Sequence, residues 1–104
     1  MTLDVGDEEA VKKVRKRHNN KRDVEKEDIR SIMRLPGGRA FLWRLLSQCG
    51  VYHENLYPES PGAAQRQEGR RAMGLWVIKE IEDADPHAYA RMRDEASNME
   101  RKND

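Results

Sequence analysis

Apolar residues are concentrated in one stretch of the chain, residues 37–50, which reads Gly-Gly-Arg-Ala-Phe-Leu-Trp-Arg-Leu-Leu-Ser-Gln-Cys-Gly. Its three leucines and Cys49 recur at the spacing i, i+3, i+4 and i+7, which is one face of an α-helix. Phe41 and Trp43 widen that face until little of the helix surface is left for water. Gly50 stands where a left-handed residue commonly ends a helix. The pattern therefore predicts a central helix that is buried by neighbours on several sides.

Two weaker helical patterns precede it. Residues 8–18 are strong helix formers with a thin apolar stripe, so this helix is marginal alone. Asn19 and Asn20 interrupt the pattern, and acidic residues then open a second amphipathic segment, residues 23–35, where negative charge suits the helix dipole. That segment should end before Pro36, because the residue before a proline avoids helical geometry.

The second half of the chain contains one irregular segment and a long helical pattern. Residues 51–62 lack strand alternation but are too apolar for a free linker, which predicts an ordered loop laid across the helices. Residues 63–83 then read as a helix. Gly69 and Gly74 within it cost about 1 kcal/mol each relative to alanine, so another segment should approach the backbone closely there.

Asp85-Pro86 predicts the start of a last helix, with an acidic N-cap and proline at the first helical position. The fold class expected is therefore all-α, a small four- to five-helix domain around the central helix. We divide the chain into a basic N-terminal arm (residues 1–22), a helical domain (residues 23–100) and a polar tail (residues 101–104). The predicted core consists of Phe41, Leu42, Trp43, Leu45, Leu46, Met73, Trp76, Ile81, Tyr89 and Met92.

Composition agrees with one small domain. The chain has 104 residues, of which 37% are hydrophobic and 38% charged, on the polar side of the globular range. A single cysteine cannot form an internal disulfide, as expected of a reducing compartment. No apolar run is long enough to span a bilayer, and the first residues do not resemble a secretory signal, so we expect cytoplasmic synthesis.

The residues that carry most catalytic chemistry are scattered. His18, His53 and His87 lie on three segments without a second ligand at a metal spacing, which disfavours a zinc site. Cys49 and His53 are four residues apart, but Gly50 ends the helix between them, and a thiol on an apolar face is more often packing than nucleophile. No glycine-rich phosphate loop is present. These patterns indicate a protein that is not an enzyme and that binds no cofactor, metal or small-molecule ligand.

The net charge of +1 hides a strongly basic segment. Seven cations occur in residues 11–22 without an acid among them, enough to neutralise several phosphates. The alternatives are a solvated helix and a helix that pairs with an acidic protein. The candidate residues for binding nucleic acid or an acidic partner are Lys12, Lys13, Arg15, Lys16, Arg17, Lys21 and Arg22. A helix-turn-helix reading with residues 39–49 as recognition helix fails, because that helix is dominated by apolar rather than base-reading side chains.

Three motifs resemble a known family. They are Gly-Arg-Ala-Phe-Leu-Trp-Arg-Leu-Leu-x-x-Cys-Gly-Val (residues 38–51), Glu-Gly-Arg-Arg-x-x-Gly-Leu (residues 68–75) and Ala-Asp-Pro-x-Ala-Tyr-x-Arg-Met (residues 84–92). Together they resemble a family of small helical proteins of tailed phages and prophages, named after a Bordetella phage protein. The similarity covers residues from about 29 to 95. It implies a gene of the phage morphogenesis region and supplies no catalytic residues to transfer.

The leading functional hypothesis is a non-enzymatic phage structural or assembly protein. It binds other virion proteins (portal, capsid or ejection component), with self-association as a further mode, in the host cytoplasm during assembly or in the virion. The alternative is a nucleic-acid-binding accessory factor that contacts DNA through the basic arm. An enzyme, such as a small lysis or nuclease component, is a third and weaker hypothesis.

Overall fold

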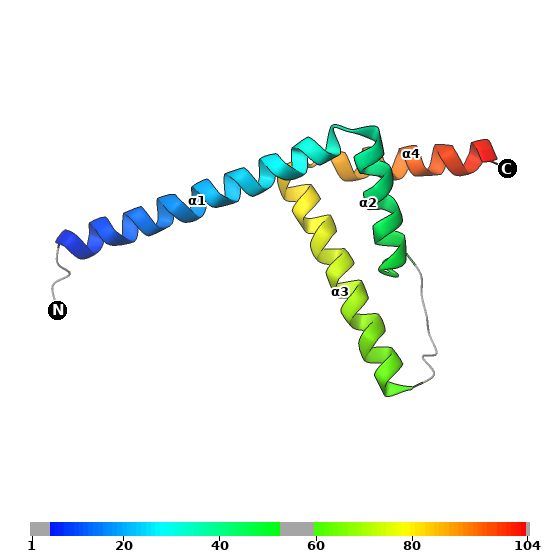
Figure 1. The fold of residues 1–104 in the computed structure, drawn as a ribbon, viewed down its shortest axis with the longest axis horizontal. Coiled ribbons are helices and arrows are strands. Elements are labelled where there is room, and N and C mark those ends of the chain that lie inside the picture. The colour runs from blue at the N-terminus through cyan, green and yellow to red at the C-terminus, as the bar shows by residue number, and fades with distance from the viewer. Residues whose placement is uncertain (1–4, 53–59, 104) are drawn as a thin grey trace.

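The computed structural model describes residues 5–52 and 60–103, which form four α-helices and no strand. The helices are α1 (Val5–Met33), α2 (Pro36–Gln48), α3 (Pro61–Ala84) and α4 (Ala88–Asn103). Helix α1 extends away from a junction at which all four helices meet (Figure 1). The all-α prediction is confirmed, and α2 is the predicted central helix.

Helix α1 is continuous, so the predicted break at Asn19 and Asn20 is wrong. Asparagine is a mediocre helix former, but it costs well under 1 kcal/mol per position. The residues on both sides favour helix, and the second half of α1 packs on α3. The helix propensity of these residues and the packing on α3 together outweigh the cost of the two asparagines. The two expected helices therefore form one helix of 29 residues.

The turn from α1 to α2 is tight and depends on Pro36 and Gly38. Leu35 has extended backbone angles, as expected before a proline, and Pro36 is the first residue of α2. Gly37 and Gly38 lie inside the first turn of α2 and not in the link between α1 and α2. A Cβ atom on Gly38 would overlap the carbonyl oxygen of Ile32, so only glycine allows α1 and α2 to come this close.

The other helix ends follow their local sequence. Gly50, after α2, has a φ of 74°, the left-handed conformation predicted for it. Ser60 caps α3 by accepting a hydrogen bond from the Ala63 amide at 3.1 Å. The Asp85 carboxylate accepts one from the His87 amide at 3.0 Å, and α4 begins at Ala88, two residues beyond the predicted proline position. Helix α4 continues through residues 101–103, which were expected to form a polar tail.

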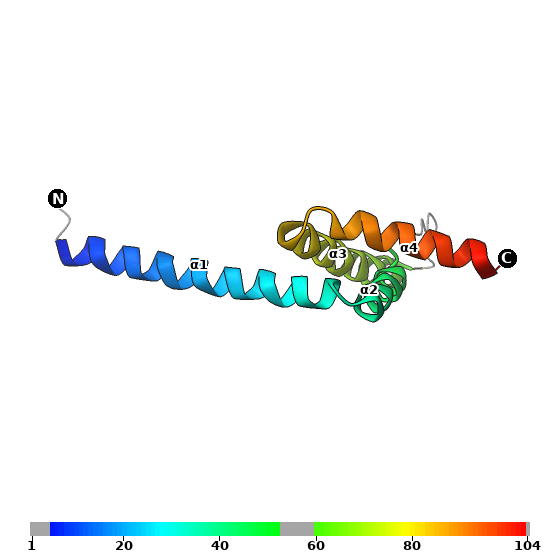
Figure 2. The same ribbon diagram turned by 90° about the horizontal axis from the view of Figure 1, so that it is seen from above.

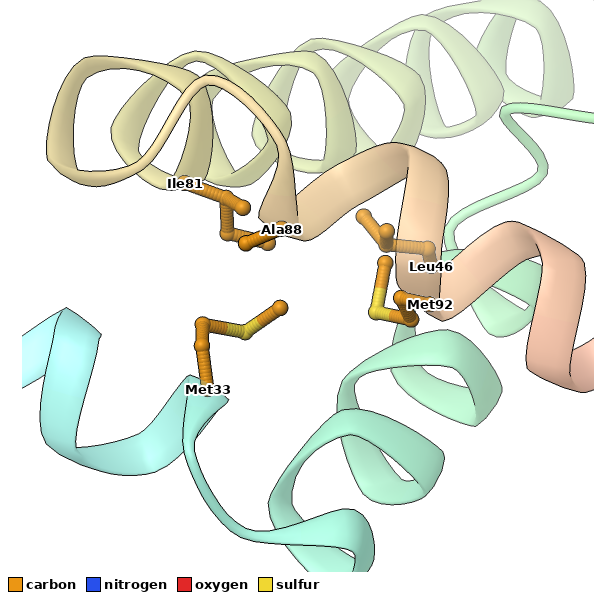
Figure 3. Packing of buried hydrophobic residues seen from close by; sticks show 5 residues of the cluster. All are labelled: Met33, Leu46, Ile81, Ala88 and Met92. Atoms are coloured by element: carbon orange, nitrogen blue, oxygen red, sulfur yellow. The ribbon is translucent and has the colours of Figure 1, made fainter.

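The core is small and receives side chains from every helix (Figure 3). Leu46 of α2, Ile81 of α3 and Met92 of α4 are fully buried. Met33 of α1 and Ala88 of α4 complete the cluster. Around it pack six partly buried side chains: Ile29, Leu42, Trp43, Val77, Ile78 and Tyr89.

Four residues of the predicted core are exposed, and their assignment to the core is wrong. The exposed fractions are 55% for Phe41, 37% for Leu45, and 57% for both Met73 and Trp76. The reason is the shape of the protein. The chain extends over 67 × 38 × 15 Å, and because a helix is about 10–12 Å wide, helices that meet in so thin a body leave outer faces uncovered (Figure 2). Helix α2 is therefore covered by its neighbours on part of its surface only.

The overall dimensions are those of an extended protein. The radius of gyration is 19.6 Å, whereas a compact chain of this length has a value of about 13 Å. Among the described residues, six apolar residues are buried and twelve large hydrophobic side chains are exposed. The chain thus buries less of its apolar surface than a globular domain of the same length.

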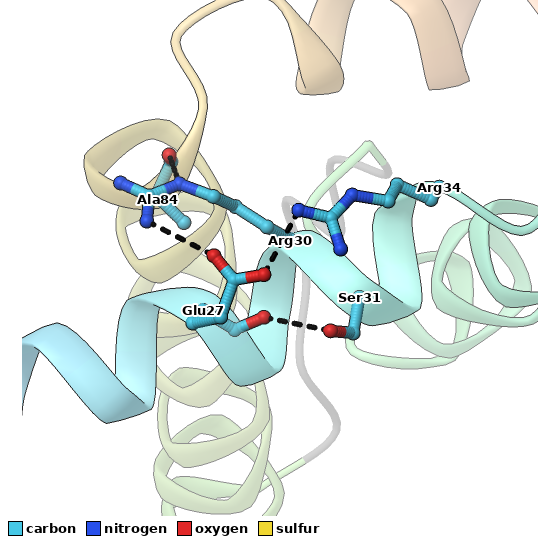
Figure 4. Close-up of polar contacts among 5 residues, drawn as sticks. All are labelled: Glu27, Arg30, Ser31, Arg34 and Ala84. Carbon is cyan, nitrogen blue, oxygen red and sulfur yellow. Dashed lines mark hydrogen bonds and ion pairs between the residues drawn. The ribbon is translucent and has the colours of Figure 1, made fainter.

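Polar contacts reinforce the junction at two places. Arg30 of α1 donates a hydrogen bond of 2.7 Å to the carbonyl oxygen of Ala84, which satisfies the end of α3 (Figure 4). Glu27 accepts from Arg30 at 3.4 Å and from Arg34 at 2.8 Å. The hydrogen bond from Arg34 lowers the pKa of Glu27.

Arg39 is the second polar anchor and the one buried charged residue among those described. Its Nε lies 3.0 Å from both carboxylate oxygens of Glu95 on α4, and its Nη1 donates to the Met33 carbonyl oxygen at 2.6 Å. One guanidinium thus joins α1, α2 and α4. The hydrogen bond from Arg39 lowers the pKa of Glu95, whose carboxylate also accepts a hydrogen bond from Arg91.

Close packing explains one of the two glycines, Gly69 and Gly74, at which a close approach was expected. A Cβ on Gly74 would overlap the Val51 side chain and lie 2.8 Å from the Cys49 Cβ, so the predicted close approach exists there. Of the loop predicted for residues 51–62, residues 53–59 lie outside the described part of the chain. Within that part, Tyr52 stacks on Trp43 with ring centroids 4.7 Å apart and shares a 2.8 Å hydrogen bond with Tyr89. Gly69 has open space where a Cβ would be, so the expectation for this position is wrong.

Candidate interaction surfaces

The basic arm projects from the junction as a free helix. Residues 7–21 are all exposed, and this part of α1 runs clear of the other three helices (Figures 1 and 2). Six of the seven candidate cations lie on this exposed segment: Lys12, Lys13, Arg15, Lys16, Arg17 and Lys21. Their placement leaves them accessible to a large partner.

The seventh cation, Arg22, has a different role from the one predicted. Its guanidinium lies 2.6 Å from Glu80 and 3.2 Å from Asp83, both on α3, and 3.9 Å from Glu25. The hydrogen bond to Glu80 is the main cause of a raised Arg22 pKa. Because these carboxylates already hold the charge, Arg22 anchors the arm to α3, and we remove it from the candidate binding residues.

The two sides of the arm differ in chemistry. Successive residues of an α-helix are rotated by about 100°, which places five cations within one half of the helix circumference. We call this half the basic face; it consists of Lys12, Lys13, Lys16, Arg17 and Lys21. The other half carries Val11, Val14 and His18, in the direction of Arg22 and therefore of α3. Arg15 also lies within that second half, because it is seven residues from Arg22 and therefore only about 20° from the direction of Arg22.

Apolar side chains are exposed on α2 and α3. Phe41 and Leu45 are four residues apart on one face of α2, and Arg44 lies over the Phe41 ring with its Cζ 5.8 Å from the centroid. On α3, Met73 and Trp76 are three residues apart on one face, each 57% exposed. That face leads, one turn further, to Glu80 and its ion pair with Arg22.

An open groove of about 870 Å³ lies between α2 and α4. Its lining is mostly apolar and includes Ala40 and Trp43 of α2 and Ala96 and Met99 of α4, together with charged side chains such as Glu100. Met99 is 60% exposed. The groove is open and its walls offer few converging polar groups, which is typical of a protein-binding surface rather than of a small-molecule pocket.

The candidate metal ligands of the described residues come from separate segments of the chain. Within residues 5–52 and 60–103, no three histidine, cysteine or acidic side chains are grouped as a metal site. His18 and His87 are both exposed and lie on different segments, and Cys49 is half-buried near Gly74. The considered pair of Cys49 and His53 falls partly outside the described residues. The carboxylates of Glu80 and Asp83 are bound to Arg22.

Sequence reasoning missed the ion pairs between distant segments. Arg22 pairs with Glu80, 58 residues away, and Arg39 pairs with Glu95, 56 residues away. The only signal in the sequence was an arginine beside an apolar helical stripe, and this chain has several. Which arginine meets which acid depends on how the helices cross, so the pairing was not predictable.

Comparison with known proteins places the chain in a family. A family model described as Bbp19-like phage protein matches residues 29–94, which is more than half of the chain. The match starts near the end of α1 and covers the junction, α2, α3 and the first part of α4; it leaves out the arm. Neither the curated proteins nor the solved structures contain a match. None of the described helices is both long and apolar enough to cross a membrane. Because the family model covers more than half of the chain, the chain belongs to the family of Bbp19-like phage proteins.

Proposed function

We propose that this phage protein is a non-enzymatic structural or assembly component that binds other virion proteins, such as portal, capsid or ejection proteins. One observation carries the proposal: among the described residues, twelve large hydrophobic side chains are exposed on a thin, extended body in which six apolar residues are buried. Exposed apolar surface in this amount commonly marks protein interfaces. Membership of a phage family supports virion proteins as the class of partner.

The chemistry of the surface supports binding over catalysis. Phe41 on α2 and Trp76 on α3 are the kind of large aromatic side chain that dominates the binding energy of interfaces. The apolar groove between α2 and α4 adds a concave surface into which a partner side chain or helix fits. Assembly would take place in the host cytoplasm, and the protein would remain with the virion if its partner does.

The test is affinity capture with the tagged full-length protein from infected cells, together with mass spectrometry of purified virions. We expect a portal, capsid or ejection protein to be captured in stoichiometric amounts. Its recovery should fall at least about tenfold for Met73→Ala/Trp76→Ala, because truncating an aromatic anchor of an interface costs about 2 kcal/mol or more.

The matched control is Lys79→Ala/Glu82→Ala, which changes two exposed polar residues of the same helix and should leave capture unchanged. The proposal fails if no virion protein is captured and the protein is missing from virions. Equal capture by both double variants would exclude this face of α3 and direct the same test to Phe41 and Leu45.

A further inference from the structure

We propose that the basic face of the arm binds the phosphate backbone of duplex nucleic acid. The basic face consists of Lys12, Lys13, Lys16, Arg17 and Lys21, as defined above. This inference goes beyond the proposed function, which requires only protein partners for the apolar surfaces of α2, α3 and α4. It gives a role to the part of the chain that lies outside the family match.

The arm is sterically suited to a nucleic-acid groove. Residues 5–21 form a single helix about 25 Å long at 1.5 Å per residue, and every residue from 7 to 21 is exposed. The first side chain engaged by the rest of the protein is Arg22. The major groove of B-form DNA is about 12 Å wide and admits one α-helix. A helix that is free on all sides for this length can lie in the groove or along its edge without a clash from the junction.

The distribution of charge defines the size of the contact. Residues 10–22 contain no acid, whereas Asp7, Glu8 and Glu9 precede them and Asp23 and Glu25 follow. The five cations therefore occupy about 14 Å of helix between two acidic boundaries. Because they spread over half of the circumference, they can reach phosphates on both sides of a groove. We expect three to five phosphate contacts.

The ion pairs of Arg22 determine which way the basic face points. Arg22 is bound by Glu80 and Asp83 of α3, on the side of α1 that carries Val11, Val14 and His18. The basic face is therefore held turned away from α3 and toward solvent. Since Arg22 already has its partners, it takes no part in the contact.

The same geometry favours nucleic acid over an acidic protein. The centre of a protein interface is depleted in charged residues, and most of its binding energy comes from a few desolvated aromatic or arginine anchors. The basic face has no aromatic or large aliphatic side chain, and Val11 and Val14 lie on the other half of the helix. Contacts to a phosphate backbone need only lysine and arginine, and they are independent of base sequence.

The experiment is fluorescence anisotropy of a labelled 20-base-pair DNA duplex titrated with the full-length protein at several salt concentrations. Three to five phosphate contacts predict a slope of log K against log salt of about −3 to −4.5. The variant Lys12→Gln/Lys13→Gln/Lys16→Gln/Arg17→Gln/Lys21→Gln should weaken binding at low salt by about tenfold or more and bring the slope close to zero. Circular dichroism checks that the helices remain.

The control variant removes the same number of positive charges from α3 and α4. It is Arg66→Gln/Arg70→Gln/Arg71→Gln/Lys79→Gln/Lys102→Gln, and all five side chains are exposed. It should bind the duplex within about threefold of the unchanged protein, because these cations lie outside the basic face. Equal losses for the two variants would overturn the proposal, since net charge alone would then explain the binding.

Two other results would also overturn it. One is no binding of the duplex at low salt. The other is binding of labelled polyglutamate as tight as that of the duplex and equally lost in the arm variant, which would identify the basic face as a surface for an acidic protein. None of these results depends on the capture of virion proteins through Trp76, so this inference and the proposed function succeed or fail separately.

Discussion

The two halves of α1 have the same secondary structure but are stabilised in different ways. From Arg22 to Met33 the helix is held by side chains that reach other helices: Arg22 binds Glu80, Arg30 caps α3, and Met33 enters the core. From residue 7 to 21 no side chain is buried. The first half is helical because of its own residues and because the second half continues it.

This difference separates what folds the protein from what the protein offers to partners. Helical stability in proteins comes mainly from tertiary packing rather than from propensity, so the junction of the four helices is where substitutions should affect folding. The arm and the exposed faces of α2 and α3 contribute little to folding and are free to evolve for binding. The predictions below test this separation, beginning with the largest expected effect.

Leu46→Ala should lower the free energy of unfolding by about 3 kcal/mol. Leu46 has no exposed surface, and its truncation leaves a cavity between α2, α3 and α4. Leu75→Ala is the matched control, because Leu75 is 46% exposed on α3 and should cost less than about 1 kcal/mol. Urea denaturation followed by circular dichroism measures both. Similar costs for the two leucines would mean that the junction is not the folding core.

Substitutions at two glycines of α3 should have opposite signs. Gly74→Ala should destabilise by about 1–3 kcal/mol, because the new methyl group overlaps Val51 and Cys49. Gly69→Ala should stabilise by about 0.5–1 kcal/mol, because its Cβ meets open space in the middle of a helix. The same denaturation measurement applies. Stabilisation by both substitutions would show that the segment after α2 does not pack on α3.

The sequence was sufficient to predict the fold class and most helix ends. Periodicity identified α2, and residues with specific backbone preferences located its boundaries: Pro36 is its first residue, and Gly50 with its φ of 74° follows its end. These signals act through the local backbone geometry, so they hold for any tertiary arrangement of the helices. The break expected at Asn19 and Asn20 failed because the cost of two asparagines is smaller than the gain from continuing a helix that is anchored further on.

The sequence was not sufficient to tell core from interface. Phe41 and Leu46 belong to the same apolar helix, yet Phe41 is 55% exposed and Leu46 is fully buried. Apolar side chains that are buried in the core and apolar side chains that bind a partner produce the same periodicity in the sequence of a helix. The same limit applied to the cations, since Arg22 and Lys21 are neighbours in sequence and only the crossing of α1 over α3 gives Arg22 its carboxylates.

Stability should fall at acidic pH through Glu95, by a smaller amount than in the two preceding predictions. The hydrogen bond from Arg39 lowers the pKa of Glu95 in the folded protein, so the unfolded chain binds more protons than the folded one between the lowered value and the ordinary one. The stabilisation is complete above the ordinary glutamate pKa of 4.5 and is lost as the pH falls through the lowered value.

Glu95→Gln should therefore be less sensitive to acid than the unchanged protein when unfolding is measured between pH 6 and pH 3. Some sensitivity should remain, because the pKa of Glu27 is lowered in the same direction by Arg34. Glu82→Gln, on an exposed residue of α3, serves as the control and should keep the full acid sensitivity. If Glu95→Gln and Glu82→Gln lose the same amount of stability between pH 6 and pH 3, the ion pair of Arg39 with Glu95 does not contribute to folding.

The smallest effect on stability should come from the largest change in charge. The arm variant with glutamine at all five positions of the basic face should unfold within about 0.5 kcal/mol of the unchanged protein, because exposed side chains without partners contribute little to folding. The single substitution Arg22→Gln should destabilise more than those five together, since it removes the cation that Glu80 and Asp83 share. Urea denaturation of the two variants side by side decides the comparison. A greater loss in the arm variant would mean that the basic face is held by the folded protein itself, and the division of α1 at Arg22 would have to be abandoned.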